Sequence, residues 1–160
     1  MMRIGFGYDV HSLVLDRKLI LGGVEVPFHK GLRGHSDADV LIHATIDAIL
    51  GALAQGDIGT LFPDNEDQYK DIDSRILLRK VAGILHLEGY KIGNVDSTIC
   101  AEAPKMKPYI MQMRENIAFD LNCDIHLISV KATTEEGMGF TGKEQGISAK
   151  AVCLIKRLQE

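Results

Sequence analysis

The sequence has no tryptophan, only three cysteines and no run of basic residues longer than two. Cys100, Cys123 and Cys153 form no C-x-x-C pair, and their odd number predicts reduced thiols in a cytoplasmic protein. A net charge of −4 without a basic patch gives no reason to expect a nucleic-acid partner. No apolar stretch reaches membrane-spanning length and no targeting peptide is recognised, so we expect no membrane association.

The 160 residues, of which 46% are hydrophobic and 25% charged, predict one globular domain over residues 1–160. Strand and helix patterns alternate, which places the chain among mixed α/β or α+β proteins. We expect strands over 2–11, 18–21, 24–28, 90–101 and 125–132, and helices over 36–54, 74–87 and 106–121. The spacing of apolar residues over 147–158 favours a helix, although the alternation there also fits a strand.

The predicted helix over 36–54 is apolar around almost its whole circumference, with a single narrow polar stripe. The stripe consists of Ser36, Asp39, His43 and Asp47, each about one turn from the next. Ser36 and Asp39 are spaced as a capping box that would begin the helix. Charged groups on a buried helix need partners, so the stripe should face something charged. The alternative is a solvated stripe on an amphipathic helix.

A metal site is suggested by the sequence Asp9-Val10-His11 at the end of the first strand. Alternation places Asp9 and His11 on one face, and His43 from the polar stripe could be the third ligand. One carboxylate and two imidazoles suit Zn²⁺, and three protein ligands leave the open position of a catalytic site. The alternative is a capped strand end that carries a surface histidine.

Three other segments could bind anions or a flat ring. His35-Ser36, at the predicted helix start, would offer free backbone N–H groups, although a plain N-cap is equally consistent. The glycine- and threonine-rich loop over 132–143 could hold phosphates, with Glu136 binding a hard divalent cation, or could simply contain tight turns. The stretch 101–107 could accept a flat ring beside a phosphate.

Five motifs in order carry a resemblance to a known family. They are G-x-G-x-D-V-H at 5–11, H-S-D-x-D-V at 35–40, G-D-I-G-x-L-F-P-D at 56–64, A-P-K-M at 103–106, and K-A-T-T…G-F-T-G at 131–142. Together they resemble the 2-C-methyl-D-erythritol 2,4-cyclodiphosphate synthases of the non-mevalonate isoprenoid pathway, over residues 3 to about 158.

The resemblance implies a lyase that converts 4-diphosphocytidyl-2-C-methyl-D-erythritol 2-phosphate to the cyclic diphosphate and CMP. It implies one zinc per chain on Asp9, His11 and His43, and a second divalent cation, Mg²⁺ or Mn²⁺, on Glu136. His35 and Thr134 would donate to the transition state. The implied substrate-binding residues are Ser36, Asp57, Ile58, Gly59, Phe62, Pro63, Asp64, Asn65, Glu66, Ala101, Glu102, Ala103, Pro104, Lys105, Met106, Lys107, Thr133, Glu135, Phe140 and Lys143.

The family's architecture implies an α+β fold, with a mixed four-stranded sheet, helices packed on one face and a small β-hairpin. It also implies that the segment 147–158 is a strand, and that the chain forms homotrimers with active sites between subunits. Glu135, Lys143 and Gln145 depart from the residues most common in the family.

Two other functions remain open, a zinc-dependent phosphoesterase acting on a nucleotide and a non-catalytic trimeric binding module. No Ser–His–Asp or Cys–His arrangement is recognised among the motifs, so we expect no covalent enzyme intermediate.

Overall fold

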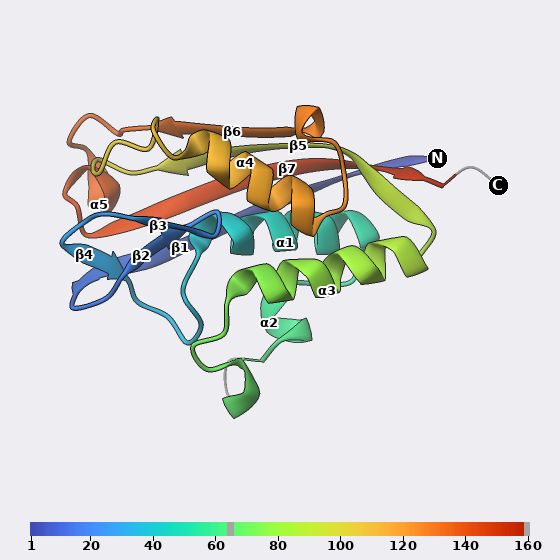
Figure 1. The fold of residues 1–160 in the computed structure, drawn as a ribbon, viewed down its shortest axis with the longest axis horizontal. Helices are drawn as coiled ribbons and strands as arrows, with labels where there is room; N and C mark the ends of the chain where they lie inside the picture. Colours follow the sequence, from blue (N-terminus) through green and yellow to red (C-terminus); the bar gives the residue numbers. More distant parts are fainter. Residues whose placement is uncertain (64–65, 159–160) are drawn as a thin grey trace.

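The computed structural model describes residues 1–63 and 66–158, and its framework is one mixed β-sheet. Four long strands run in the order β1–β7–β5–β6, and β5 and β6 form the parallel pair while the other pairs are antiparallel. Their bounds are β1 (Met2–Leu15), β5 (Tyr90–Cys100), β6 (Ile128–Thr133) and β7 (Gly146–Arg157). The predicted α+β fold with these four strands is confirmed (Figure 1).

A fifth strand, β4 (Lys30–Leu32), adds to the free edge of β1. The sequence did not predict it because three residues with a central glycine show no alternation. The predicted hairpin is present as β2 (Leu19–Leu21) and β3 (Val24–Val26), joined at Gly22 and Gly23, which both have positive φ.

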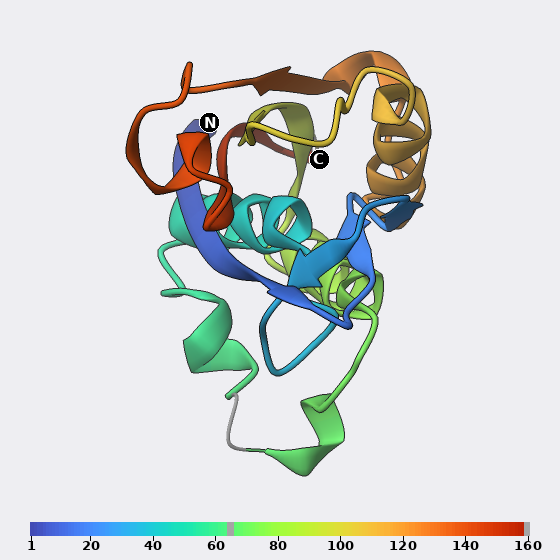
Figure 2. The ribbon, with the colours of Figure 1, turned by 90° about the vertical axis from the view of Figure 1, so that its left-hand side faces the viewer.

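Three helices longer than ten residues pack on the sheet: α1 (Val40–Leu53), α3 (Ser74–Leu87) and α4 (Ile110–Asp120). Helix α1 lies against β1 and β7, beside α3, and Figure 2 shows β1 curving around it. The short elements are α2 (Ile58–Leu61), α5 (Gly139–Gly142), and the 3₁₀ turns η1 (Asp67–Tyr69) and η2 (Ile125–Leu127). None of the described helices combines the length and apolar character needed to cross a membrane.

Two helix starts differ from the predictions. The helix expected over 106–121 begins only at Ile110, because residues 107–109 form a turn in which Tyr109 N donates to Met106 O at 2.9 Å. The helix expected over 36–54 begins at Val40, and its N-cap is Asp39, whose carboxylate accepts from Ile42 N at 3.1 Å.

The predicted capping box and the helix-terminal anion site at His35-Ser36 are therefore wrong, because both residues precede the helix by several positions. Ser36 Oγ accepts instead from Ala38 N at 3.1 Å, two residues on, and Ala38 has positive φ. A short local hydrogen bond of this kind competes with helix formation and keeps the segment in a loop.

Helix α1 approaches β1 closely because β1 carries glycine where the two backbones meet. A Cβ at Gly5 would lie 1.8 Å from Ala48 O, and a Cβ at Gly7 would lie 1.9 Å from Ala44 O. Gly5 and Gly7 share a strand face with Asp9 and His11, so the same close approach brings these two side chains to α1.

We expect Gly7→Ala to destabilise the protein by more than about 3 kcal/mol, because the new methyl group would overlap backbone atoms of α1. Urea unfolding followed by circular dichroism measures the change. Gly51→Ala is the matched control, because its Cβ would meet its nearest atom, Phe6 O, at 3.7 Å. The control should be neutral or stabilising by about 1 kcal/mol. Equal losses in the two variants would contradict the close-approach argument.

Candidate metal centre and substrate pocket

Asp9, His11 and His43 meet at one point between β1 and α1. Asp9 Oδ2 lies 2.8 Å from His11 Nε2 and 3.0 Å from His43 Nδ1, and the two histidine nitrogens are 3.2 Å apart. His43 is buried, whereas Asp9 and His11 are half-buried. The structure thus brings together the three residues that the sequence pointed to.

The three ligand atoms fit a divalent cation. Bond lengths of 2.0–2.2 Å to zinc in a tetrahedral site place neighbouring ligand atoms about 3.3 Å apart. The observed separations of 2.8–3.2 Å are close to this value, and the three atoms leave one side of the site open. Two imidazoles and one carboxylate are a ligand set that zinc accepts.

Proton affinities at this centre follow from its internal hydrogen bonds. Burial acts to raise the pKa of Asp9, but hydrogen bonds from His11 and His43 outweigh it and hold the pKa well below its usual value. Burial acts to lower the pKa of His11, yet the hydrogen bond and charge of Asp9 raise it overall. The carboxylate is therefore ionised at neutral pH and ready to bind a cation.

Both histidines are held in orientation by groups that the sequence analysis missed. His11 Nδ1 donates to Arg33 O at 2.8 Å, which leaves Nε2 for the metal. His43 Nε2 lies 2.8 Å from Ser74 Oγ, which in turn donates to Asp37 Oδ1 at 2.5 Å. Ser74 is the first residue of α3 and Asp37 lies in the loop before α1, so the two are far apart in sequence. No motif in the sequence links them.

The distances around His43 match those of a Ser–His–Asp triad, formed by Ser74, His43 and Asp9, which the motifs did not reveal. The chemistry differs, because Ser74 gives its proton to Asp37 and so must accept, not donate, at His43 Nε2. Ser74 is also fully buried at the start of α3. The hydroxyl therefore orients the imidazole and is not placed to attack a substrate.

The polar stripe of α1 faces partners along its length, which excludes the solvated alternative, but the expected charged partner is present only at His43, which faces Asp9. The partners of the two carboxylates are backbone N–H groups. Asp39 accepts from the N–H groups of Gly22 and Gly23 at 2.9 and 2.6 Å, which ties the hairpin to α1. His43 points to the metal centre. Asp47 accepts from Ile58 N at 2.7 Å and fixes the start of α2.

A cavity of about 370 Å³ opens beside the metal centre. His35 lies at this cavity, and its Nε2 donates to Glu66 O at 3.2 Å. Asp57 is the N-cap of α2 and accepts from Thr60 N at 2.8 Å, and Pro63 O accepts from Glu66 N. The expected substrate residues that line the cavity are Ser36, Ile58, Gly59 and Phe62. Asp64 and Asn65, also expected here, lie outside the described residues.

The other expected binding residues lie in a separate place. A cavity of about 360 Å³ forms where the loop after β5 meets the end of β6, and Ala101 N donates to Thr133 O at 3.0 Å. It shares no lining residue with the cavity at the metal centre. The predicted residues that line it are Ala101, Glu102, Pro104, Lys105, Met106, Lys107, Thr133 and Thr134, while Ala103 lies within the same loop.

The loop from Thr134 to Lys143 is ordered by its own contacts. Glu135 Oε2 accepts from Thr141 Oγ1 at 2.6 Å, and Gly137 N donates to Glu102 Oε2 at 3.4 Å. Glu136 has positive φ and an exposed side chain, and Phe140 and Lys143 are exposed as well. Glu136 is not part of a cluster of three His, Cys, Asp or Glu side chains in the described chain, so a cation there would also need oxygen ligands of other kinds, such as phosphates or water.

These features define a class: an α+β protein in which three side chains that can hold a divalent metal lie beside a cavity. The model of the YgbB family matches residues 2–156. A 2-C-methyl-D-erythritol 2,4-cyclodiphosphate synthase of Clostridioides difficile is 63% identical over 154 residues, 96% of each chain. One from Finegoldia magna is 64% identical over 156 residues, 98% of each chain. The chain belongs to the YgbB family, and its identification with the cyclodiphosphate synthases is confirmed.

Solved structures agree with this assignment. A Plasmodium falciparum IspF, described as a CDP complex, superposes with a TM-score of 0.87 at 37% identity, covering 99% of this chain and 97% of the other. The bifunctional IspDF of Campylobacter jejuni gives a TM-score of 0.96 at 38% identity. The similarity covers 99% of this chain but only 43% of the bifunctional one, so this chain corresponds to one part of that protein.

Proposed function

We propose that the chain converts 4-diphosphocytidyl-2-C-methyl-D-erythritol 2-phosphate to 2-C-methyl-D-erythritol 2,4-cyclodiphosphate and CMP. An oxygen of the 2-phosphate forms a bond to the phosphorus nearer the methylerythritol. The bond from this phosphorus to the oxygen bridging to CMP breaks, and CMP leaves with that oxygen. The chain is thus a phosphorus–oxygen lyase of isoprenoid biosynthesis, and its substrate is a small nucleotide-linked molecule.

The observation that carries this proposal is a cavity that contains three side chains able to hold a divalent metal, and in which the hydroxyl nearest to the histidines is not placed to attack phosphorus. Asp9, His11 and His43 form the site, and Ser74, the hydroxyl nearest to His43, is buried and donates elsewhere. The substrate carries its own nucleophile, so the protein need only fold it back and balance its charge. A well-oriented intramolecular attack can lower the barrier by ~7–11 kcal/mol.

The side chains at the cavity would then orient phosphate groups and donate to them. His35 is at the cavity rim and would exchange its hydrogen bond with Glu66 O for one with a phosphate oxygen. Zinc on Asp9, His11 and His43, together with Mg²⁺ or Mn²⁺ on Glu136, would supply electrostatic neutralisation of the phosphates. Thr134 and Lys105, from the second cavity, would donate to the diphosphate and hold the cytidyl part.

The separation of the two cavities supports a homotrimer with composite sites. Within one chain, the metal centre and the cavity at Lys105 share no lining residue, although one substrate must contact both. The sheet face turned away from α1 carries exposed apolar side chains that a neighbouring chain could cover, namely Ile4, Phe6, Tyr8, Val10 and Val152. We propose that each active site joins the metal cavity of one chain to the second cavity of its neighbour.

Running the reaction in oxygen-18-labelled water tests the proposal. Intramolecular attack introduces no solvent oxygen, so both products should keep their natural masses by mass spectrometry. A zinc-dependent phosphoesterase, the main alternative, would place one labelled oxygen in CMP or in the methylerythritol product. Label in either product from the purified enzyme, above a control without enzyme, would rule out the cyclisation.

A further inference from the structure

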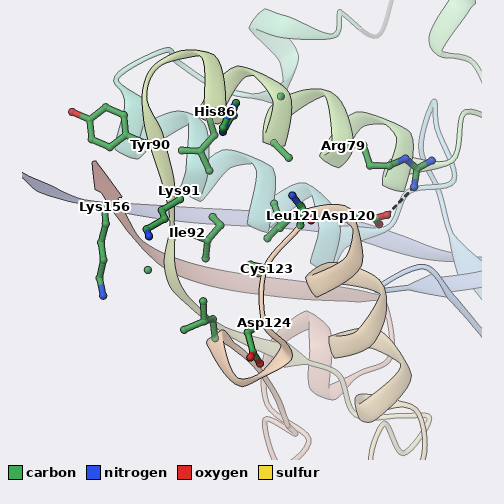
Figure 3. Close-up of a pocket in the computed structure, with 16 residues that line it drawn as sticks. Arg79, His86, Tyr90, Lys91, Ile92, Asp120, Leu121, Cys123, Asp124 and Lys156 are labelled. Atoms are coloured by element: carbon green, nitrogen blue, oxygen red, sulfur yellow. Dashed lines mark hydrogen bonds and ion pairs between the residues drawn. The ribbon is translucent and has the colours of Figure 1, made fainter. Parts of the chain in front are cut away.

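A third cavity, distinct from the cavity at the metal centre and from the one at Lys105, lies at the end of the molecule where α3 ends and β5 begins. Its volume is about 710 Å³, larger than the cavity at the metal centre, and the two share no lining residue. The C-terminal half of α3, the start of β5, the turn after α4 and the end of β7 form its walls (Figure 3). Cavities of this size are typical of small-molecule sites.

One end of the cavity carries two positive charges. Lys91 on β5 and Lys156 on β7 are directly opposed across the antiparallel pair, and Figure 3 shows both side chains extending at the same end. Like charges in this position destabilise a sheet. Within residues 1–63 and 66–158, neither ammonium has a carboxylate within 4 Å or a hydrogen-bond acceptor. An anion between the two lysines would remove this repulsion.

Two acidic groups border the cavity, Asp120 and Asp124, and the buried one, Asp120, is neutralised. Asp120 is buried, and its carboxylate accepts from Arg75 Nε at 2.6 Å and from Arg79 Nη1 at 2.8 Å. Arg79 borders the cavity at the end opposite to Lys91 and Lys156 (Figure 3). Asp124 is exposed and accepts from His126 N at 2.8 Å, and within residues 1–63 and 66–158 it pairs with no cationic side chain. Arg79, Lys91 and Lys156 outnumber the two carboxylates, so the lining is net positive although the whole chain has a net charge of −4.

Gly83 in the middle of α3 adds an independent observation. Glycine is, after proline, the least favourable residue in a helix interior. A Cβ at Gly83 would meet no atom within 4 Å, so no packing within the chain requires glycine there. Arg79, Gly83 and His86 follow each other on one face of α3, and all three border the cavity. The bare backbone leaves room for a molecule to lie against the helix.

We propose that this cavity binds an amphipathic anion, an organic phosphate or carboxylate with an apolar body. The anionic group would lie between Lys91 and Lys156 near His86. The apolar body would contact the hydrophobic side chains that line the middle of the cavity, which are Leu85, Ile92, Leu121 and Leu127. This inference does not depend on the proposed reaction, because none of these residues belongs to the metal centre or to the second cavity.

Titration with octyl phosphate, followed by two-dimensional amide NMR, tests the proposal on the intact protein. The amide signals of Gly83 and Gly93, which border the cavity, should shift with a saturable dependence. Octanol and inorganic phosphate should each bind at least about tenfold more weakly, because each supplies half of the contacts. Octanoate, used in parallel, decides whether carboxylate or phosphate is the preferred head group. Equal binding of octanol, or no shift at these amides, would overturn the proposal.

Two variants locate the binding. Lys91→Gln with Lys156→Gln should weaken octyl phosphate binding about tenfold or more, while Lys18→Gln, which alters a lysine on the hairpin, should not. Gly83→Leu should raise Tm by about 2–4 °C, because leucine is the better helix former and its Cβ would meet no atom within 4 Å. The same variant should weaken binding at least about tenfold, because its side chain enters the cavity. Unchanged binding in either variant would show that the ligand binds elsewhere.

Discussion

His43→Ala is expected to remove the metal from the chain and to lower kcat by more than about a thousandfold. Loss of a group that only orients a metal ligand typically costs 10–100-fold, and loss of a ligand costs more. The fold should persist, because His43 packs beside polar neighbours and Asp9 keeps its contact with His11 at 2.8 Å. Metal analysis of the purified protein, together with circular dichroism, measures both outcomes. Full zinc occupancy in this variant would disprove the assignment of His43 as a ligand.

Ser74→Ala should weaken zinc binding less than His43→Ala does. Ser74→Ala keeps all three ligands but removes the nearer of the two hydroxyl oxygens at His43 Nε2, Ser74 Oγ at 2.8 Å, and leaves Ser36 Oγ at 3.2 Å. Zinc affinity should therefore fall about 10–100-fold without vanishing. Competition with a chromophoric chelator measures the affinity directly and does not require activity. Ser74→Thr retains the hydroxyl and should restore most of the affinity. If Ser74→Ala bound zinc as tightly as the unaltered protein, the hydrogen bond would be structural only.

The metal centre could be predicted because each ligand belongs to a periodic element. Alternation in β1 placed Asp9 and His11 on one face, and helical spacing placed His43 on the polar stripe of α1. Ser74 and Asp37 were missed because their contact joins two loop–helix junctions, and no periodicity relates positions in different segments. Their hydrogen bonds depend on how α3 packs against α1, which is a property of the tertiary structure.

The helix boundaries show the same division between local and tertiary information. Helix α3 begins at Ser74 and ends at Leu87 as predicted, because Asp73 caps it and Gly89 follows with positive φ. The start of α1 was wrong because Ser36 and Asp39 could each serve as N-cap. Asp39 prevails because its carboxylate also holds Gly22 and Gly23 of the hairpin, contacts that the local sequence does not encode.

The segment 147–158 has a sequence pattern that fits both a helix and a strand, and pairing with its neighbours makes it a strand. Residues of β7 lie between β1 and β5, with Phe6 opposite Val152 on one side and Asp96 opposite Val152 on the other. Both edges of the segment are thus hydrogen-bonded, so it adopts the strand form that its alternation allowed. Periodicity alone favoured a helix, and only the family resemblance predicted the strand.

Phe6→Glu is expected to convert the proposed trimer into monomers at micromolar concentration and to abolish activity. Phe6 is 61% exposed in the single chain, at the centre of the apolar sheet face defined by Ile4, Phe6, Tyr8, Val10 and Val152. A carboxylate there would have to be buried without a partner in every interface, which costs several kcal/mol per subunit. Sedimentation velocity measures the assembly. Phe119→Glu is the matched control, because Phe119 is 75% exposed on α4, on the other side of the sheet.

Mixed trimers test the reason why activity would require assembly, namely that each active site combines cavities from two chains. A chain with His43→Ala lacks the metal cavity but keeps the second cavity, and a chain with Lys105→Ala has the opposite defect. If each site combines cavities from two chains, random co-assembly should restore about one intact site in four, although each variant alone is inactive. If both cavities of a site belonged to one chain, every site would carry a defect. Co-expressed chains that assemble but show no activity above the separate variants would therefore contradict composite sites.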